Sequence, residues 1–203
     1  MDISFVYFDV GQVLVSNQLG WRKFVAENKF SEEEAKLFWE GWGEVSDKIC
    51  KGSLSPEQGV KFIESKVGRE LGEEFNLVDE TVKMFAPIKQ TQHLMVTLQQ
   101  KYKVGLLSNS YPGMIDGLLQ QRKLPTVYYS VIMDSSEVQL IKPEPKIFTL
   151  AAQRAGVKPK EIFLIDDSSK HVDAAQELGW NVYQFNEAEG ERGVTEISSV
   201  LLK

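Results

Sequence analysis

Acidic and polar side chains follow several short apolar runs of this sequence, each close to the point where the run ends. The residues concerned are Asp9, Ser108, Asn109, Asp134, Asp166 and Asp167. If the runs are parallel strands, their carboxyl ends meet at one edge of a sheet, which is where open α/β sheets bind ligands. Separate parts of the chain would then deliver carboxylates, a hydroxyl and an amide to one crevice.

Three clustered carboxylates repel one another unless a cation or a proton neutralises them. Carboxylate oxygens suit Mg²⁺, which takes one or two protein carboxylates and completes its shell with water and substrate phosphate. Lys142, which precedes Pro143-Glu144-Pro145, could add a compensating positive charge, and Ser108 and Asn109 could donate to phosphate oxygens. These residue types indicate a phosphoryl-handling site with an aspartate nucleophile.

The elements that must position these side chains can be read from the periodicity of the chain. Apolar runs with the composition of buried strands are Ile3 to Phe8, Lys103 to Leu107, Val127 to Met133, Ile162 to Ile165 and Asn181 to Phe185. From residue 103 onward they alternate with segments at helical spacing, which is typical of βαβ units in a parallel sheet. We therefore expect an α/β fold with a Rossmann-like parallel sheet covered by helices on both faces.

Residues 16–86 differ from the rest because their apolar positions recur at helical spacing only. Ser31 stands three residues before Glu34, which is the spacing of a capping box, and Ser55-Pro56 has the form of another helix start. The pattern predicts an all-helical domain over 16–86, inserted into a core made of 1–15 and 87–203. Its aromatic set of Trp21, Phe24, Phe38, Trp39 and Trp42 is more typical of a domain core than of a substrate pocket.

Four motifs in this order resemble the haloacid dehalogenase (HAD) superfamily. They are Phe8-Asp9-Val10-Gly11-Gln12-Val13-Leu14, Leu106-Leu107-Ser108-Asn109, Ile141-Lys142-Pro143-Glu144-Pro145-Lys146-Ile147-Phe148 and Phe163-Leu164-Ile165-Asp166-Asp167-Ser168. The helical insert is similar to the cap of that superfamily. The Asp-x-Gly form, combined with Lys-Pro-Glu-Pro, is similar to its small sugar-phosphate phosphatases.

The resemblance implies a role for each matching position. Asp9 would be the nucleophile that becomes a phospho-aspartate, Ser108 and Asn109 would bind the phosphoryl group, and Lys142 would stabilise charge on nucleophile and phosphate. The implied activity is a Mg²⁺-dependent phosphatase acting on a small phosphorylated metabolite.

The resemblance also implies a set of Mg²⁺ ligands. Asp9 and Asp167 would bind the ion, the main-chain carbonyl of Gly11 would contribute, and Asp166 would assist directly or through water. Most phosphatases of the superfamily carry an Asp where this chain has Gly11, and that Asp protonates the leaving group. Its loss favours a substrate with a less basic leaving group, such as an anomeric sugar phosphate.

Two other functions stay open at this point. A 2-haloacid dehalogenase also attacks through an aspartate and lacks the second Asp, although the pair Asp166-Asp167 argues against it because dehalogenation needs no metal. A catalytically weak member that binds phosphate or a protein partner is the other alternative. His171 is either a partly exposed helix residue or a residue that orients Asp167 or contributes proton transfer, and Asp134 is either a strand-end cap or part of the site.

Composition excludes several classes of function. The net charge of −6 and the pI near 5.1 argue against a nucleic-acid partner, and a single cysteine, Cys50, excludes an intramolecular disulfide framework. The sequence has no apolar segment of the length that a membrane span requires, and the first apolar run is too short for a signal peptide. We expect a cytoplasmic enzyme with a small-molecule substrate and no obligate protein partner.

Overall fold

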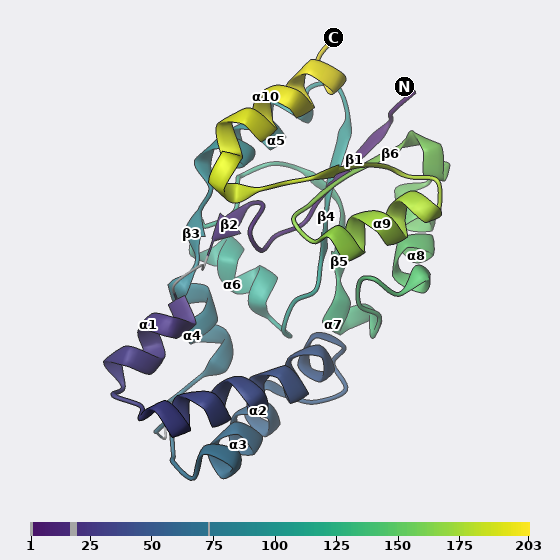
Figure 1. Cartoon of the computed structure of the whole chain (residues 1–203). Coiled ribbons are helices and arrows are strands. Elements are labelled where there is room, and N and C mark those ends of the chain that lie inside the picture. Colours follow the sequence, from purple (N-terminus) through teal and green to yellow (C-terminus); the bar gives the residue numbers. More distant parts are fainter. Residues whose placement is uncertain (1, 17–19, 73) are drawn as a thin grey trace.

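The computed structural model describes residues 2–16, 20–72 and 74–203, and its centre is a five-stranded parallel sheet (Figure 1). The strands are β1 (Phe5–Phe8), β4 (Lys103–Ser108), β5 (Tyr129–Asp134), β6 (Ile162–Asp166) and β7 (Asn181–Gln184), in the order β5-β4-β1-β6-β7. Their pairings are parallel throughout. The expected strands and the α/β class are confirmed, with ends that differ by one or two residues.

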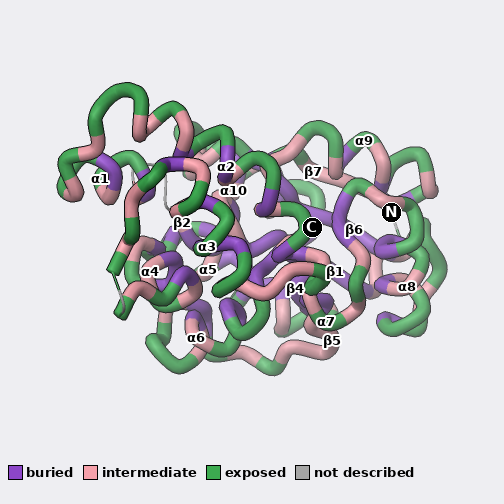
Figure 2. The backbone as a smooth tube through the Cα atoms, turned by 90° about the horizontal axis from the view of Figure 1, so that it is seen from below, coloured by how far each residue is buried: buried purple, intermediate pink, exposed green. Residues whose placement is uncertain are grey.

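Helices cover both faces of this sheet because the side chains of β1 alternate between two apolar clusters. Val6 and Phe8 pack with α5 (Lys89–Leu98), α6 (Met114–Gln120) and α10 (Gly190–Leu201). Phe5 and Tyr7 pack with α8 (Pro145–Ala155) and with α9 (Ser169–Glu177). Figure 2 shows the central strands β1, β4 and β6 buried and the edge strands β5 and β7 mostly of intermediate burial, with exposed residues on the outer turns of the helices. Short elements complete the core, namely α7 (Ser135–Val138), η1 (Pro159–Glu161) and η2 (Glu187–Glu189).

The helical insert contains α1 (Gly20–Glu27), α2 (Glu32–Cys50), α3 (Pro56–Val67) and α4 (Leu77–Met84). It leaves the core after β2 (Val15–Ser16) and returns through β3 (Ala86–Pro87), and these two short strands pair antiparallel. In Figure 1 the insert lies beyond the end of the sheet at which the strands finish. We call these four helices the cap, because they sit over the carboxyl edge of the sheet.

Local signals begin the two longest cap helices, as the sequence predicts. At the start of α2, the Glu34 N–H donates to Ser31 Oγ (3.2 Å) and the Ser31 N–H donates to Glu34 Oε2 (2.7 Å). Ser55 and Gln58 make the same reciprocal pair at the start of α3, with Pro56 in the first turn. These bonds satisfy main-chain donors that have no partner within their own helix.

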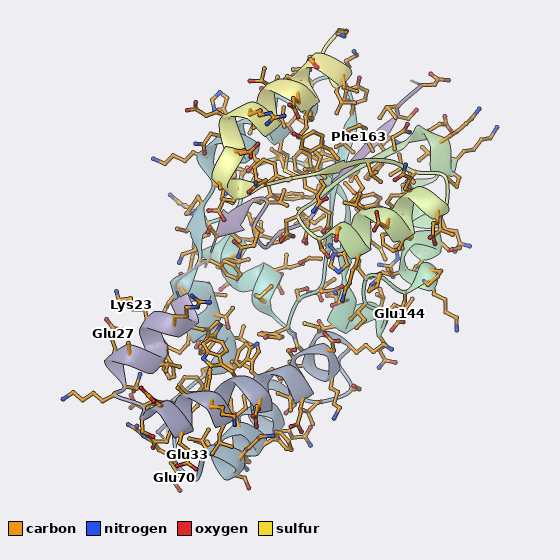
Figure 3. All side chains as sticks on the ribbon, viewed as in Figure 1. Lys23, Glu27, Glu33, Glu70, Glu144 and Phe163 are labelled. Atoms are coloured by element: carbon orange, nitrogen blue, oxygen red, sulfur yellow. The ribbon has the colours of Figure 1, made fainter. Side chains whose placement is uncertain are left out.

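An aromatic cluster forms the interior of the cap. Its rings belong to Trp21, Phe24, Phe38, Trp42 and Phe75. Phe38 is fully buried, whereas the neighbouring Trp39 is 39% exposed and lies at the surface. The expected core role therefore holds for this cluster and not for Trp39. Charged side chains labelled in Figure 3, such as Lys23 and Glu33, lie on the outer side of the cap.

Polar contacts join the cap to the core beside the carboxyl edge. Glu144, labelled in Figure 3, lies just before α8, and its Oε1 is 2.6 Å from Lys51 Nζ at the end of α2. Ser135 is fully buried, and its hydroxyl donates to the carbonyl of Cys50 (2.6 Å). No helix in the described parts of the chain is long and apolar enough to cross a membrane.

Candidate functional site

The carboxyl edge of the sheet brings together residues from three strands. Asp9 follows β1, Ser108 ends β4 and Asp166 ends β6. The register pairs Phe8 with Leu106 on one side and with Ile165 on the other, so that Asp9 lies level with Leu107 and Asp166. The Asp9 N–H donates to the carbonyl of Ile165 (2.9 Å), which fixes the exit of β1. The convergence expected from the sequence is therefore present for these residues.

A buried ammonium lies between two of the carboxylates. Lys142 Nζ is 2.5 Å from Asp166 Oδ2 and 3.0 Å from Asp9 Oδ1. Lys142 is 2% exposed, Asp166 is fully buried and Asp9 is 7% exposed. Burial alone would lower the pKa of Lys142, but the charges of Asp166 and Asp9 raise it above its usual value. The ammonium therefore keeps its proton and holds the two carboxylates together.

The two carboxylates respond to this ammonium in opposite ways. Burial raises the pKa of Asp9 to about 7, Lys142 opposes that rise, and the charges of Asp166 and Asp167 add to it. Burial would also raise the pKa of Asp166, but Lys142 and His171 bring it down to about 2. The difference arises because Asp166 has the shorter contact with Lys142 and further donors of its own. Asp166 is thus the permanently ionised member of the pair.

Hydrogen bonds occupy both oxygens of Asp166. Oδ2 faces Lys142, while Oδ1 accepts from the Ser168 N–H (3.0 Å) and lies 3.0 Å from His171 Nδ1. The expectation of a partly exposed helix histidine is confirmed for His171, because its imidazole is half-buried in α9, but the alternative contact with Asp167 is wrong, since its partner is Asp166. Asp167 is half-buried, and burial followed by the charge of Asp166 raises its pKa.

Gly11 lies in a tight turn directly after Asp9. The Gln12 N–H donates to the carbonyl of Val15 (2.7 Å) and the Val15 N–H donates to that of Val10 (3.0 Å), so these bonds leave out the Gly11 carbonyl. A Cβ placed on Gly11 would meet nothing within 4 Å, and its φ lies outside the left-handed range. The backbone therefore does not require glycine here, and the space where a side chain would begin is open.

Asn109 uses its amide on the main chain of Lys142. Its Nδ2 donates to the Lys142 carbonyl (2.9 Å), and the Lys142 N–H donates to its Oδ1 (2.8 Å). Ser108 is buried at the end of β4, with Asp134 as its register partner in β5. Asp134 Oδ1 accepts from the N–H (2.9 Å) and the hydroxyl (2.7 Å) of Ser136. The interpretation of Asp134 as a strand-end cap is therefore confirmed.

Ser135 is a connecting residue that sequence reasoning missed. Besides its bond to Cys50, its Oγ accepts from the Ser110 N–H (2.9 Å), so one hydroxyl links the end of α2 to the loop after β4. A polar residue directly after a buried strand was the available signal. Asp134, one residue earlier, gave the stronger signal because its side chain is ionisable.

The donor set at this edge fits a hard divalent cation. Asp9 and Asp166 contact the ammonium of Lys142, and Asp167 follows Asp166 directly; burial and then the repulsion between these carboxylates raise the pKa of Asp9 and of Asp167. Ligand atoms of Asp9, Asp166 and His171 lie within 4.8 Å of one another. Asp9 and Asp167 add carboxylate oxygens to this group, and oxygen ligands are the chemistry that Mg²⁺ prefers.

Similar proteins include both phosphatases and a dehalogenase. A phosphoglycolate phosphatase of Shigella dysenteriae is 27% identical over 88% of this chain and 79% of its own length. The (S)-2-haloacid dehalogenase 4A of Burkholderia cepacia is 29% identical, but over only 42% of this chain and 36% of its own length.

Solved structures share the fold across almost the whole chain. The HAD family enzyme BT-2542 of Bacteroides thetaiotaomicron, crystallised with magnesium and inorganic phosphate, is 26% identical with a TM-score of 0.70 over 92% of this chain and 96% of its own. A predicted HAD-like family hydrolase of Porphyromonas gingivalis has a TM-score of 0.75 at 22% identity and full coverage of both chains. The family model for haloacid dehalogenase-like hydrolases matches residues 3–179, and the chain therefore belongs to this family of hydrolases.

Proposed function

We propose that the protein is a Mg²⁺-dependent phosphatase of a small phosphorylated metabolite and that Asp9 is its nucleophile. The observation that carries this proposal is the placement of the Asp9 carboxylate 3.0 Å from the buried ammonium of Lys142, at the carboxyl end of the central strand. Similarity to phosphatases supports phosphoryl transfer as the reaction.

The chain supplies a nucleophile and a charge partner for the first step. A carboxylate oxygen of Asp9 forms a bond to phosphorus while the bond from phosphorus to the leaving oxygen breaks. Lys142 is already in place beside Asp9, so that its charge stabilises the transferring group without reorganisation. Water then attacks the phospho-aspartate and returns Asp9 as a carboxylate, with inorganic phosphate as the second product.

Residues with oxygen donors would hold the Mg²⁺. We assign Asp9, Asp167 and the Gly11 carbonyl as its ligands, and Asp166 as the residue that holds Lys142 beside them. When bound, the ion would neutralise negative charge on the phosphate and the nucleophile. Ser108 supplies a hydroxyl at the same edge, and we assign it to the phosphate oxygens.

Gly11 restricts the substrates that suit this site. It offers no acid to protonate a departing alkoxide, and acid assistance is worth roughly 10² to 10⁴ in rate. Substrates whose leaving group is weakly basic lose least from that absence. An anomeric sugar phosphate has such a leaving group, and we propose this class of substrate in preference to simple alkyl phosphates.

A dehalogenase is the second candidate, because a haloacid dehalogenase is among the similar proteins. The carboxylates around Lys142 argue for the phosphatase. They suit a divalent cation, which phosphoryl transfer uses to neutralise the phosphate, whereas dehalogenation has no phosphate and needs no metal. Chelation separates the two: EDTA should abolish phosphate release. Halide release from a 2-haloacid that persists in EDTA would establish the dehalogenase instead.

A screen for phosphate release tests the proposal directly. Sugar phosphates, nucleotides, alkyl phosphates and an aryl phosphate would be compared with Mg²⁺ present, using the wild type and Asp9→Asn. We expect turnover by the wild type and none by the variant. Unchanged activity in Asp9→Asn would contradict the assigned nucleophile, and phosphate binding with no release from any substrate would identify a binding protein.

A further inference from the structure

We propose that Asn109 is a positioning residue that holds the main chain of Lys142, in place of the phosphate contact expected from the sequence. The proposal rests on the proposed function, because Lys142 matters through its charge beside Asp9. It concerns how that charge is placed beside the nucleophile.

Two reciprocal hydrogen bonds carry the proposal. Asn109 Nδ2 donates to the Lys142 carbonyl at 2.9 Å, and the Lys142 N–H donates to Asn109 Oδ1 at 2.8 Å. Both distances are those of normal hydrogen bonds between N–H groups and oxygen atoms. Together they fix the plane of the side-chain amide and engage both of its heavy atoms, which leaves one N–H of the amide for any other partner.

Lys142 needs such an anchor because no strand or helix holds its backbone. It lies in the segment 139–144, between α7 and α8. The residue is almost fully buried, so its N–H and carbonyl are shielded from water and need partners within the protein. The bond from the Glu144 N–H to the Ile141 carbonyl (2.8 Å) shapes this segment but does not attach it to the sheet. Asn109 makes that attachment.

The hydrogen bonds of Asn109 fix the Lys142 backbone relative to the edge of the sheet that carries Asp9. Asn109 directly follows β4, whose register with β1 is fixed by the sheet ladder. Lys142 is therefore held at both ends, at its main chain by Asn109 and at its ammonium by Asp166. A lysine side chain has four rotatable bonds, and fixing both of its ends places the charge 3.0 Å from Asp9 Oδ1 before substrate arrives.

A double-mutant cycle separates positioning from direct phosphate binding. With an aryl phosphate and Mg²⁺, Asn109→Ala should lower kcat by roughly 10²-fold, the cost expected for a displacement near 1 Å. In a Lys142→Met background, the same change should alter kcat/KM by no more than about twofold, because the residue through which Asn109 acts is gone. If Asn109 bound phosphate itself, its full effect on kcat/KM and on inhibition by inorganic phosphate would persist in that background.

Asn181→Ala is the matched control. Asn181 Nδ2 also donates to main-chain carbonyls, those of Lys160 (2.7 Å) and Ile162 (3.2 Å), but at the opposite end of the sheet. It should lower thermal stability without changing kcat. An equal loss of kcat in Asn181→Ala would show that the effect of Asn109→Ala is only structural, and would overturn the proposal.

A crystal structure of Asn109→Ala with Mg²⁺ and inorganic phosphate gives a second test that needs neither turnover nor the Lys142 variant. We expect Lys142 Nζ to be displaced from Asp9 while Ser108 stays in place. An unmoved Lys142 would overturn the proposal. If the wild type releases no phosphate from any substrate, the proposed function fails, whereas the position of Lys142 in this structure still decides the role of Asn109.

Discussion

Replacing Gly11 with Asp should convert the site to one that handles basic leaving groups. A Cβ at this position meets nothing within 4 Å, and the backbone φ is one that an Asp adopts without strain. The new carboxyl group would stand two residues after Asp9, beside the crevice. It would give the leaving oxygen a proton donor that the present side chain, a single hydrogen atom, cannot provide.

The size of the gain follows from two opposing effects. General acid assistance contributes roughly 10² to 10⁴ in rate, which is about 3 to 5 kcal/mol. The added negative charge repels Asp9 across the ~7 Å that two residues span, at a cost of about 2 kcal/mol for an effective dielectric constant near 20. We therefore expect kcat/KM for an alkyl phosphate to rise roughly 10- to 100-fold.

The assay compares two substrates that differ in their need for the acid. Gly11→Asp should raise kcat/KM for an alkyl phosphate and lower that for an aryl phosphate by roughly 30-fold, because the aryl leaving group departs without a proton and the cost of about 2 kcal/mol from charge repulsion remains. Gly11→Asn is the control, since it has the same shape and no acidic proton. Equal changes for both substrates, or the same gain in Gly11→Asn, would refute the reasoning.

Three further predictions concern charge, metal and the interior of the cap. Burial raises the pKa of Asp9 from 3.8 to about 7, so Asp9 stabilises the metal-free fold below about pH 4 and that contribution is lost as the pH rises through 7. Metal-free Asp9→Asn should therefore unfold with a free energy up to about 4 kcal/mol above the wild type at pH 8, a gap that closes near pH 4 in urea titrations. Mg²⁺ at ~100 times its Kd should stabilise the wild type by about 2.7 kcal/mol and leave the melting temperature of Asp167→Asn unchanged. Phe38→Ala should cost roughly 3 to 5 kcal/mol in the same titrations, whereas Trp39→Ala should cost less, because Trp39 is 39% exposed and touches Phe38 only edge to face.

Periodicity and local signals were sufficient to predict the fold. The apolar runs of β1 and β6 are long enough to be read as strands, and a capping box such as that of Ser31 is decided by residues within one helical turn. The parallel arrangement then follows from the helices between the strands. The ends of the strands were predicted less accurately. The last residues of β4 and β6 are the polar Ser108 and Asp166, which a purely apolar criterion leaves out.

The contacts inside the site could not be read in the same way. Successive side chains point to opposite sides of an extended segment, so Asp166 and Asp167 cannot both face Lys142, and nothing in the sequence shows which one does. The structure gives that contact to Asp166. His171 then meets the same carboxylate because α9 begins immediately beyond it.

Contacts made by irregular segments were the hardest to predict from the sequence. The partner of Asn109 is 33 residues away, and its identity depends on the path of the chain between α7 and α8, which has no period to read. Ser135 was missed for a related reason: its bonds join three segments that only the complete fold brings together.

The pairing of β2 with β3 has a consequence for how this architecture can change. Ser16 and Ala86 are register partners, so the chain leaves the core and re-enters it at neighbouring points. A tight turn joining these two residues would replace everything between them without moving a strand of the parallel sheet, and closing so short a loop costs little entropy. The same junction would accept an insert of another size or fold. The covalent connection between the cap and the core is therefore confined to one pair of neighbouring points, and an exchange of the cap would otherwise remove only side-chain contacts such as those of Glu144 with Lys51 and of Ser135 with Cys50.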